Sequence, residues 1–391
     1  MIKEEIKDPL QFYLLGLKNA VLLIEENDGN YPLEKICDAT SRYLLGKKDY
    51  QENKPMIVGI GASKGGVGKS TVAINLGHAF ARAGLKVGVV DTDLADPNDA
   101  LYIYQDTNDL RLGRNENVVF DNKGNLVDVL FGRKVDGKRS LQRKPFTEIG
   151  RQSKTKPNLT YFLLEQLGDS YGERGNSAMV IQTVQNILLK ESRKLKDYDV
   201  VILDFPAGTP EHLSAYIGCD ERGYVVDFGN RASFSGIYNI SRLVAKKKID
   251  GNNFLFINRI PQFANRQKLQ DAFAKISNTL ERFVQSFGED YYMRQAQRIV
   301  PTTNEFLKQL NLEKLAFDSR PAFLRGLKDV EKSTDYGMPY LASLTKTEER
   351  SFGYSREMFT LAMGMFDSYL KKISTNNLPK NLEGRTTWLI I

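Results

Sequence analysis

Cysteine is scarce in this sequence: the 391 residues include only Cys37 and Cys219, which lie far apart and form neither a CxxC pair nor a cluster with histidine. This spacing suggests neither a disulfide framework nor a cysteine-rich metal site. Long apolar runs are also missing, because no window of the sequence approaches the roughly 18 residues that cross a bilayer. The first residues, MIKEEIKD, lack the basic-then-apolar order of a secretory signal. We expect a cytoplasmic protein.

Acidic residues are fewer than basic ones, with 48 Asp and Glu against 55 Lys and Arg and a formal net charge of +7. A basic balance favours acidic partners such as nucleic acid, anionic lipid or a nucleotide. The basic residues are spread along the chain rather than gathered in one tail, so a solvated surface also accounts for most of them.

Hydrophobic residues make up 41% of the chain, enough to bury a substantial core. Short apolar runs, separated mostly by helical patterns, are typical of buried parallel strands. They lie at Met56–Ile60, Val87–Val90, Val200–Leu203, Tyr224–Val226 and Phe254–Ile257. This order predicts an α/β fold with a doubly wound, mostly parallel sheet, in which ligands bind at the carboxyl ends of the strands.

The remaining patterns divide the chain. Residues 1–50 carry two helical patterns and are interpreted as a helical N-terminal extension. Apolar positions at 352–370 predict a closing helix, so we place the main domain at 56–373 and a tail at 374–391.

Two stretches inside the main domain fit the strand and helix alternation poorly. Residues 105–158 are rich in Arg, Lys, Asn and Gly, and residues 262–310 carry a long polar helical pattern. We interpret both as insertions, the second one helical, and the sequence assigns neither a role.

A glycine-rich loop, KGGVGKST at residues 64–71, follows the first apolar run and precedes a helical pattern. A phosphate-binding loop needs converging backbone N–H groups, small residues and a helix N-terminus aimed at the anion. Lys69 would pair with the β and γ phosphates, and the Ser70 hydroxyl would coordinate Mg²⁺. The general pattern has a glycine where this chain has Ser63. The expected phosphate-binding residues are Gly65, Gly66, Val67, Gly68, Lys69, Ser70 and Thr71.

The segment Lys64–Thr71 resembles the deviant Walker A box of the MinD/ParA family of ATPases, whose first position varies and whose following lysine is the family's mark. The resemblance implies that ATP and Mg²⁺ bind here. It also implies a homodimer that forms face to face when both monomers hold ATP. Lys64 would then reach the partner's site and neutralise charge on the transferring phosphoryl group, as an arginine finger does.

Two acidic strand ends resemble the switches of that family. Asp91 and Asp93 end the second apolar run and resemble switch I, so Asp93 would orient or activate the attacking water and Asp91 would support the Mg²⁺ shell. Asp204 is followed by FPAG and resembles the D-x-P-A-G of switch II. Asp204 would hold Mg²⁺ through a water, and the Gly208 N–H would sense the γ-phosphate.

Two asparagines complete the resemblance. Asn98 lies five positions after Asp93, as a nucleotide-proximal asparagine does in MinD-like members. Asn258 and Arg259 end the last apolar run and resemble the family's base-recognition loop, and the asparagine amide can both donate to and accept from an adenine edge.

The resemblance covers residues 56–260 by motif and 312–370 more loosely, where Gly337-Met338-Pro339 is similar to a late G-x-P turn. It implies a nucleotide switch in intracellular positioning or partitioning, such as DNA or plasmid segregation or placement of a cellular machine. Hydrolysis would be slow, Mg²⁺-dependent and stimulated by an activating partner protein.

Two surfaces stay open for the ATP-bound form, which would be associated with the nucleoid or with a membrane. A ParA-like, non-specific DNA-binding version would use basic residues near the dimer face. The candidates are Lys246 to Lys248, Arg320, Arg325 and Lys328. A MinD-like membrane version needs a C-terminal amphipathic helix, which residues 374–391, with Pro379 and Gly384, do not predict. The basic charge favours DNA.

Other classes share the fold. Delivery or maturation ATPases, as in the Mrp, NifH and arsenite-pump relatives, also carry the signature lysine, but those that hold iron–sulfur clusters need paired cysteines at the dimer interface. Isolated Cys37 and Cys219 count against that alternative. Bacterial tyrosine kinases usually lack the signature lysine and have a tyrosine-rich tail, and neither feature fits. A helical adaptor, in which residues 1–50 recruit a partner, is compatible with the positioning hypothesis.

Overall fold

The computed structural model describes most of the chain between residues 54 and 377. The expected helical extension at 1–50, the insertion at 262–310 and the tail beyond 377 lie outside the described residues. The described ranges are 54–94, 96–113, 118–120, 124–131, 134–135, 138–139, 144–165, 178–208, 214–230, 233, 252–260, 322–325, 330, 336–344 and 354–377.

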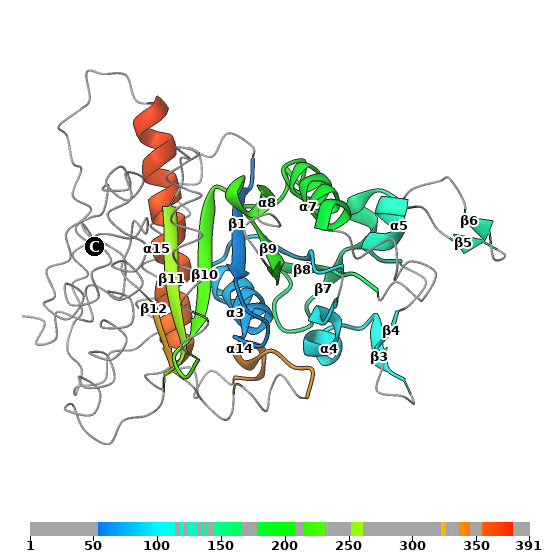
Figure 1. The fold of residues 1–391 in the computed structure, drawn as a ribbon, viewed down its shortest axis with the longest axis horizontal. Helices are drawn as coiled ribbons and strands as arrows, with labels where there is room; N and C mark the ends of the chain where they lie inside the picture. The colour runs from blue at the N-terminus through cyan, green and yellow to red at the C-terminus, as the bar shows by residue number, and fades with distance from the viewer. Residues whose placement is uncertain are drawn as a thin grey trace, which may run out of the picture.

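An eight-stranded sheet forms the centre of the described part, in the order β12-β11-β10-β1-β9-β2-β8-β7 (Figure 1). All neighbouring strands pair in parallel except the edge strand β7, which is antiparallel to β8. The expected doubly wound, mostly parallel sheet is thereby confirmed. The strands are β1 (Met56–Ala62), β2 (Val87–Asp91), β7 (Arg151–Gln152), β8 (Leu159–Phe162), β9 (Val200–Ala207), β10 (Glu221–Asp227), β11 (Asn252–Ile260) and β12 (Ala322–Arg325).

Helices cover both faces of this sheet. They are α3 (Lys69–Arg82), α4 (Asp99–Ile103), α5 (Leu126–Phe131), α7 (Ala178–Ser192), α8 (Ser214–Ile217), α14 (Tyr340–Ser343) and α15 (Tyr354–Asn377), with short 3-10 helices η2 (Tyr104–Asp106) and η3 (Phe146–Ile149). On one face, α15 and α14 pack against α3. On the other face, α7 packs against α8.

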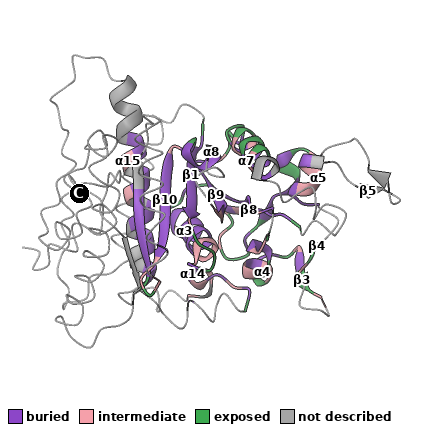
Figure 2. Cartoon of the chain, viewed as in Figure 1, coloured by how far each residue is buried: buried purple, intermediate pink, exposed green. Residues whose placement is uncertain are grey.

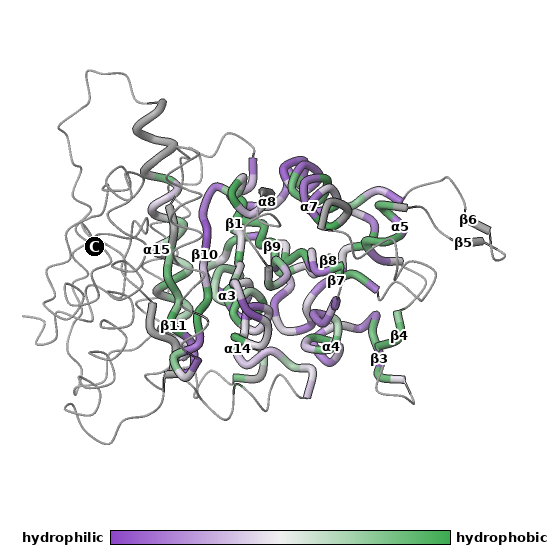
Figure 3. Tube along the Cα trace, in the orientation of Figure 1, coloured by the Kyte–Doolittle hydropathy of each residue, from purple (hydrophilic) through white to green (hydrophobic). Residues whose placement is uncertain are grey.

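The alternation of side chains along β1 explains how the two faces form. Val58 and Ile60 join the core that contains α3 and α15, whereas Ile57 joins the core that contains α7 and α8. Because successive residues of a strand point to opposite faces, a strand buried on both sides is apolar throughout. Figure 2 shows β1, β9 and β10 as mostly buried, and Figure 3 shows α7 with both hydrophilic and hydrophobic residues, as expected of a helix with one face in solvent.

Residues 105–158, interpreted from the sequence as an insertion, contain two antiparallel hairpins and the edge strand β7. The hairpins are β3 (Leu110–Leu112) with β4 (Val118–Phe120), and β5 (Lys134–Val135) with β6 (Lys138–Arg139). Figure 1 shows the β5–β6 hairpin standing away from the sheet. At its end this stretch joins the main sheet through β7, so it is continuous with the core.

The strands that the sequence predicts are all present, and each is longer than its apolar run. The closing helix α15 reaches Asn377 and so enters the segment interpreted as the tail. Pro379 follows soon after, and the residue before a proline is disfavoured in a helix. Among the described residues, no helix combines the length and apolar character that a membrane crossing needs.

Candidate functional site

The glycine-rich loop connects the carboxyl end of β1 to α3 and leaves room for an anion. Gly66 has a φ of 74° and Gly68, which caps α3, has a φ of 90°. A side-chain carbon added to Gly65 or Gly66 would meet no atom within 4 Å, so both backbones face open space. The first turn of α3 carries no acidic residue. The N-terminal N–H groups and the helix dipole therefore favour an anion at this point.

Asn258, at the end of β11, supports this loop from the side. Its side-chain Nδ2 donates to the Val67 carbonyl over 2.9 Å, and a carbon added to Gly68 would lie 2.5 Å from the same nitrogen. Asn258 is buried. The sequence predicts adenine recognition by this amide, which stays a prediction, and the structure adds a contact that positions the phosphate-binding loop.

Arg259 turns its exposed side chain toward the neighbouring strand end. Its φ of 58° lies in the left-handed region, which is uncommon for a residue with a side chain. Nη1 lies 3.0 Å from Asp227 Oδ2 at the end of β10, and Phe228 N–H donates to the Asn258 carbonyl over 2.9 Å. These contacts hold the ends of β10 and β11 together beside the loop.

Two aspartates lie next to each other where β2 and β9 end. Asp91 is the register partner of Asp204, and the Thr92 hydroxyl donates to the Asp204 carbonyl over 2.6 Å. The Ser70 hydroxyl, in the first turn of α3, donates to Asp204 Oδ2. Parallel strands thus bring the predicted Mg²⁺ residues Ser70, Asp91 and Asp204 into one place.

Burial and mutual repulsion shape the electrostatics of these carboxyl groups. Burial raises the pKa of Asp204 to about 6, although the positive charge of Lys69 and the hydrogen bond from Ser70 oppose the rise. Burial and the nearby Asp204 raise the pKa of Asp91 well above its ordinary value. A cation placed among them would favour their ionised forms.

Asp99, the first residue of α4, is a member of this group that the sequence did not predict. It is 1% exposed, and burial followed by the charges of Asp204 and Asp91 raises its pKa well above the ordinary value. Asp99 lies eight positions beyond Asp91, outside any strand end, and only the path of the chain into α4 returns it to the site. The sequence carries no signal for that turn.

The residues present fit a hydrated divalent cation. One oxygen each of Asp91 and Asp204, and both oxygens of Asp99, are buried without a hydrogen-bond partner within the protein. The described residues hold no group of three His, Cys, Asp or Glu side chains arranged to ligate a metal by themselves. The unpartnered carboxylate oxygens suit Mg²⁺, which usually takes one or two carboxylates and completes its shell with waters and phosphate oxygens.

Asp93 is half-buried and holds the turn that follows β2. Its N–H donates to Asp91 Oδ1 over 2.9 Å, and its Oδ1 accepts the Asp96 N–H over 3.1 Å. Asn98 Nδ2 donates to the Asp96 carbonyl over 3.0 Å. These contacts order the expected switch I turn, and the water-activating role of Asp93 stays a prediction.

Gly208, at the end of the expected switch II, makes a contact that the sequence did not predict. Its N–H donates to the carbonyl of Ala62 over 3.2 Å. The same group was predicted to sense the γ-phosphate. In the conformation described, it is engaged by the strand that leads into the glycine-rich loop.

Ser63, which replaces the usual first glycine, has partners of its own. Its N–H donates to the Tyr224 hydroxyl over 2.8 Å, and its hydroxyl donates to the Ser233 carbonyl over 3.3 Å. Lys64 and Gly65, the next residues, are exposed, and Lys69 and Thr71 are half-buried at the start of α3. Ser63 therefore anchors the start of the loop to Tyr224 and Ser233, while Lys64 stays on the surface.

Comparison with known proteins identifies the family of this chain. The sequence profile of the CobQ/CobB/MinD/ParA nucleotide binding domain matches residues 58–358. A septum site-determining protein MinD homologue of Emiliania huxleyi is 28% identical over 204 residues, which are 52% of this chain and 63% of that protein. This chain thus spans less than two thirds of that relative's length. An iron–sulfur cluster carrier protein of Bacillus subtilis is 49% identical over 43 residues, 11% of this chain and 12% of that protein.

Among solved structures, the cell division ATPase MinD of Pyrococcus furiosus is 19% identical, with a TM-score of 0.48, and the alignment covers 80% of this chain and 99% of that chain. The profile match takes in more than half of the chain and every candidate site residue from Lys64 to Arg259. The resemblance to the MinD/ParA family seen at Lys64–Thr71 is confirmed. The chain belongs to the CobQ/CobB/MinD/ParA family of nucleotide-binding domains.

Proposed function

We propose that this chain is an ATPase that binds ATP with Mg²⁺, dimerises in the ATP-bound state and acts as a nucleotide switch in intracellular positioning or partitioning. The observation that carries the proposal is the open glycine loop at the N-terminus of α3, beside the Ser70 and Asp204 pair. That arrangement supplies N–H donors for phosphates and oxygens for a hydrated cation side by side.

Each part of the site has a distinct task in this proposal. Ser70 and Asp204 would hold Mg²⁺, with Asp91 behind them, and the ion would neutralise charge on the phosphates. Lys69, at the start of α3, would pair with the β and γ phosphates. Asp93 would orient the attacking water from the half-exposed turn after β2. Lys64, exposed on the loop, would act on the partner's nucleotide.

The Gly208 contact supports a switch between two hydrogen-bonding states. Its N–H is held by the Ala62 carbonyl, and a γ-phosphate would compete for the same donor. Exchange of partners would move the segment after β9, which begins four residues beyond Asp204, a proposed Mg²⁺ residue. A dimer would then respond to the state of the nucleotide.

Asp93→Ala tests the dimer. Because hydrolysis would stop while ATP binding is retained, we expect the variant to accumulate as a dimer in ATP and to stay monomeric in ADP. Light scattering on a sizing column measures the mass in each nucleotide. A variant that binds ATP yet stays monomeric would rule out the face-to-face mechanism.

The surface that the dimer contacts can be assigned with the same variant. Of the basic candidates for DNA contact, Arg325 lies within the described residues, in β12, and the others lie outside them. Binding to DNA should weaken steeply with salt, because counterions are released from phosphates. Sedimentation with anionic liposomes is the parallel assay, and binding to liposomes alone would favour the membrane version.

A delivery or maturation ATPase is the second candidate, because a short segment is similar to an iron–sulfur cluster carrier. Cys219 argues against cluster binding in the described part, since it is 2% exposed and burial raises its pKa. Iron and sulfide analysis after anaerobic reconstitution distinguishes a cluster-carrying ATPase from a positioning ATPase. A stable cluster on the dimer would support the carrier.

A further inference from the structure

Asp99 is a buried carboxylate that the protein leaves without a hydrogen-bond donor. It is 1% exposed, and both of its side-chain oxygens lack a hydrogen-bond partner within the protein. Buried polar groups are nearly always hydrogen-bonded, and a buried charge is normally paired. An aspartate in this state therefore needs a positive or donating ligand.

The neighbours of Asp99 are the groups that would hold Mg²⁺. Its carboxyl group lies close enough to interact with Asp204, Asp91 and Ser70. The Ser70 hydroxyl has one proton, and it is donated to Asp204 Oδ2. The other close neighbours are carboxylates, which only accept when ionised, so Asp99 competes with Asp204 for the single Ser70 proton.

The local charges are strongly unbalanced. Asp91, Asp99 and Asp204 are all buried, and Asp93 adds its charge to both Asp91 and Asp204. Lys69 is the cation that acts on Asp204. Like charges disfavour one another strongly in a buried place, so this set is held together only at a cost that a divalent ion would remove.

We propose that Asp99 is a further member of the Mg²⁺ site, where its carboxylate accepts hydrogen bonds from waters of the hydrated ion. This inference rests on the proposed function and names a residue beyond the Ser70, Asp91 and Asp204 set. Asp99 is a positioning residue, because it touches the hydration shell rather than the reacting atoms. Outer-shell groups of this kind orient a metal and its waters.

The contact of Asp99 with the hydrated Mg²⁺ would also affect the turn that precedes α4. Asp99 opens α4, directly after the turn that Asp91 and Asp93 hold. A hydrated ion bound by Asp99 and Asp204 would join both ends of this turn to the strand β9. Binding of Mg²⁺ would then order the turn that carries Asp93.

Asp99→Asn keeps the shape and removes the charge. In the nucleotide-free protein the variant should melt at a higher temperature than the wild type, because one of three crowded buried carboxylates is gone. In the nucleotide complex it should need roughly 10- to 100-fold more Mg²⁺ for the same gain in ADP affinity. Calorimetric titration of ADP into the full-length chain at a series of Mg²⁺ concentrations measures that shift.

Asp96→Asn is the matched control, since Asp96 belongs to the same turn, loses the same charge and is exposed. It should leave both the melting temperature and the Mg²⁺ requirement as in the wild type. Asp99→Glu keeps the charge but moves it by one methylene, and its Mg²⁺ requirement should fall between the wild type and Asp99→Asn.

A different outcome would overturn the inference. If Asp99 only stabilised the start of α4, Asp99→Asn would lower the melting temperature without nucleotide and would leave the Mg²⁺ requirement unchanged. Either result alone contradicts the proposal. If wild-type protein binds no ADP at any Mg²⁺ concentration, the proposed function itself fails and the inference falls with it.

Discussion

At the residue scale, Gly68 shows why the loop tolerates one kind of residue. Its φ of 90° suits glycine, and the Asn258 amide occupies the space where a side chain would start. Gly65 has no such neighbour. These two glycines of the loop are therefore required for different reasons. Gly65 leaves room for a ligand, whereas Gly68 allows the close approach of Asn258.

Alanine at these two positions should separate folding from binding. We expect Gly68→Ala to lose roughly 1–3 kcal/mol of unfolding free energy, because a left-handed backbone is strained with a side chain. Gly65→Ala should keep wild-type stability, because its methyl group would meet no protein atom within 4 Å, and should lose ATP affinity, because it would narrow the proposed phosphate-binding loop. Chemical denaturation and ATP titration measure the two effects. Equal stability of both variants would contradict this division.

The site could be predicted from sequence only where residues adjoin a strand end or a glycine loop. Ser70, Asp91 and Asp204 come together because parallel strands end at the same edge. Asp99 could not be predicted, since its return to the site depends on the fold of the turn before α4. The contacts of Ser63 with Tyr224, and of Gly208 with Ala62, are likewise tertiary and leave no pattern in the sequence.

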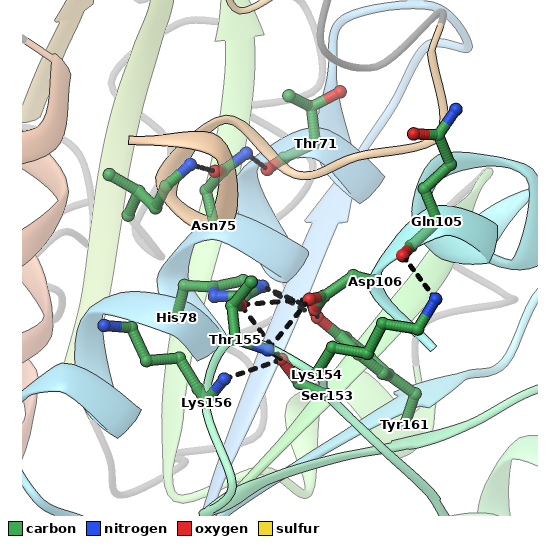
Figure 4. A network of polar contacts seen from close by, with 11 residues as sticks. Thr71, Asn75, His78, Gln105, Asp106, Ser153, Lys154, Thr155, Lys156 and Tyr161 are labelled. Carbon is green, nitrogen blue, oxygen red and sulfur yellow. Dashed lines mark hydrogen bonds and ion pairs between the residues drawn. The ribbon is translucent and has the colours of Figure 1, made fainter. Parts of the chain in front are cut away.

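At the element scale, a buried polar network ties α3 to its neighbours (Figure 4). The Tyr161 hydroxyl, on β8, donates to Asp106 Oδ2 over 2.8 Å and lies 2.7 Å from His78 Nε2 on α3. Since the tyrosine proton goes to Asp106, His78 Nε2 donates to the tyrosine oxygen. Thr155 Oγ1 donates to Asp106 Oδ1 over 2.9 Å. The helix that begins at the phosphate loop is thereby fixed to the stretch at 105–158.

Asp106→Asn should destabilise the protein in a pH-dependent way. Burial raises the pKa of the Asp106 carboxyl, but His78, Ser153 and Tyr161 outweigh it, and the pKa ends below the ordinary value. The ionised group therefore adds stability above about pH 4, and this stability is lost as the pH falls through the lower, folded-state pKa. We expect a loss of roughly 1–3 kcal/mol at pH 7 that shrinks below about pH 4.

Urea denaturation at several pH values measures this difference. Asp197→Asn is the control, because Asp197 is exposed and its loss should change stability by less than about 0.5 kcal/mol. A constant difference between Asp106→Asn and the wild type across the pH range would show that the charge of Asp106 is not what stabilises the network.

Strands were predictable where an uninterrupted apolar run stood out between helical patterns. β8 and β12 were not predicted, and each has four residues. β8 includes a threonine, and β12 ends in arginine, so neither reads as an apolar run. β8 pairs with the longer strand β2, and β12 pairs with the longer strand β11. This pairing is tertiary, so the local sequence does not encode it.

At the scale of the whole molecule, the proposed mechanism needs two chains that complete one another's sites. Lys64 is exposed, whereas Asp93 is half-buried and bonded to Asp91, one of the predicted Mg²⁺ residues. The proposed dimer places Lys64 of one chain and Asp93 of the other on the same nucleotide. Both the slow hydrolysis and the release from a surface would follow from this active site shared between two chains.

Subunit mixing tests the sharing most directly. Lys64→Ala and Asp93→Ala should each abolish ATP hydrolysis on their own. In a mixed dimer, the Lys64→Ala chain keeps its own Asp93 and receives an intact Lys64 from its partner. The ATPase rate of an equal mixture should therefore recover to roughly a quarter of the wild-type rate, because about half of the dimers are mixed and each has one complete site. A mixture as inactive as its two components would contradict the shared site.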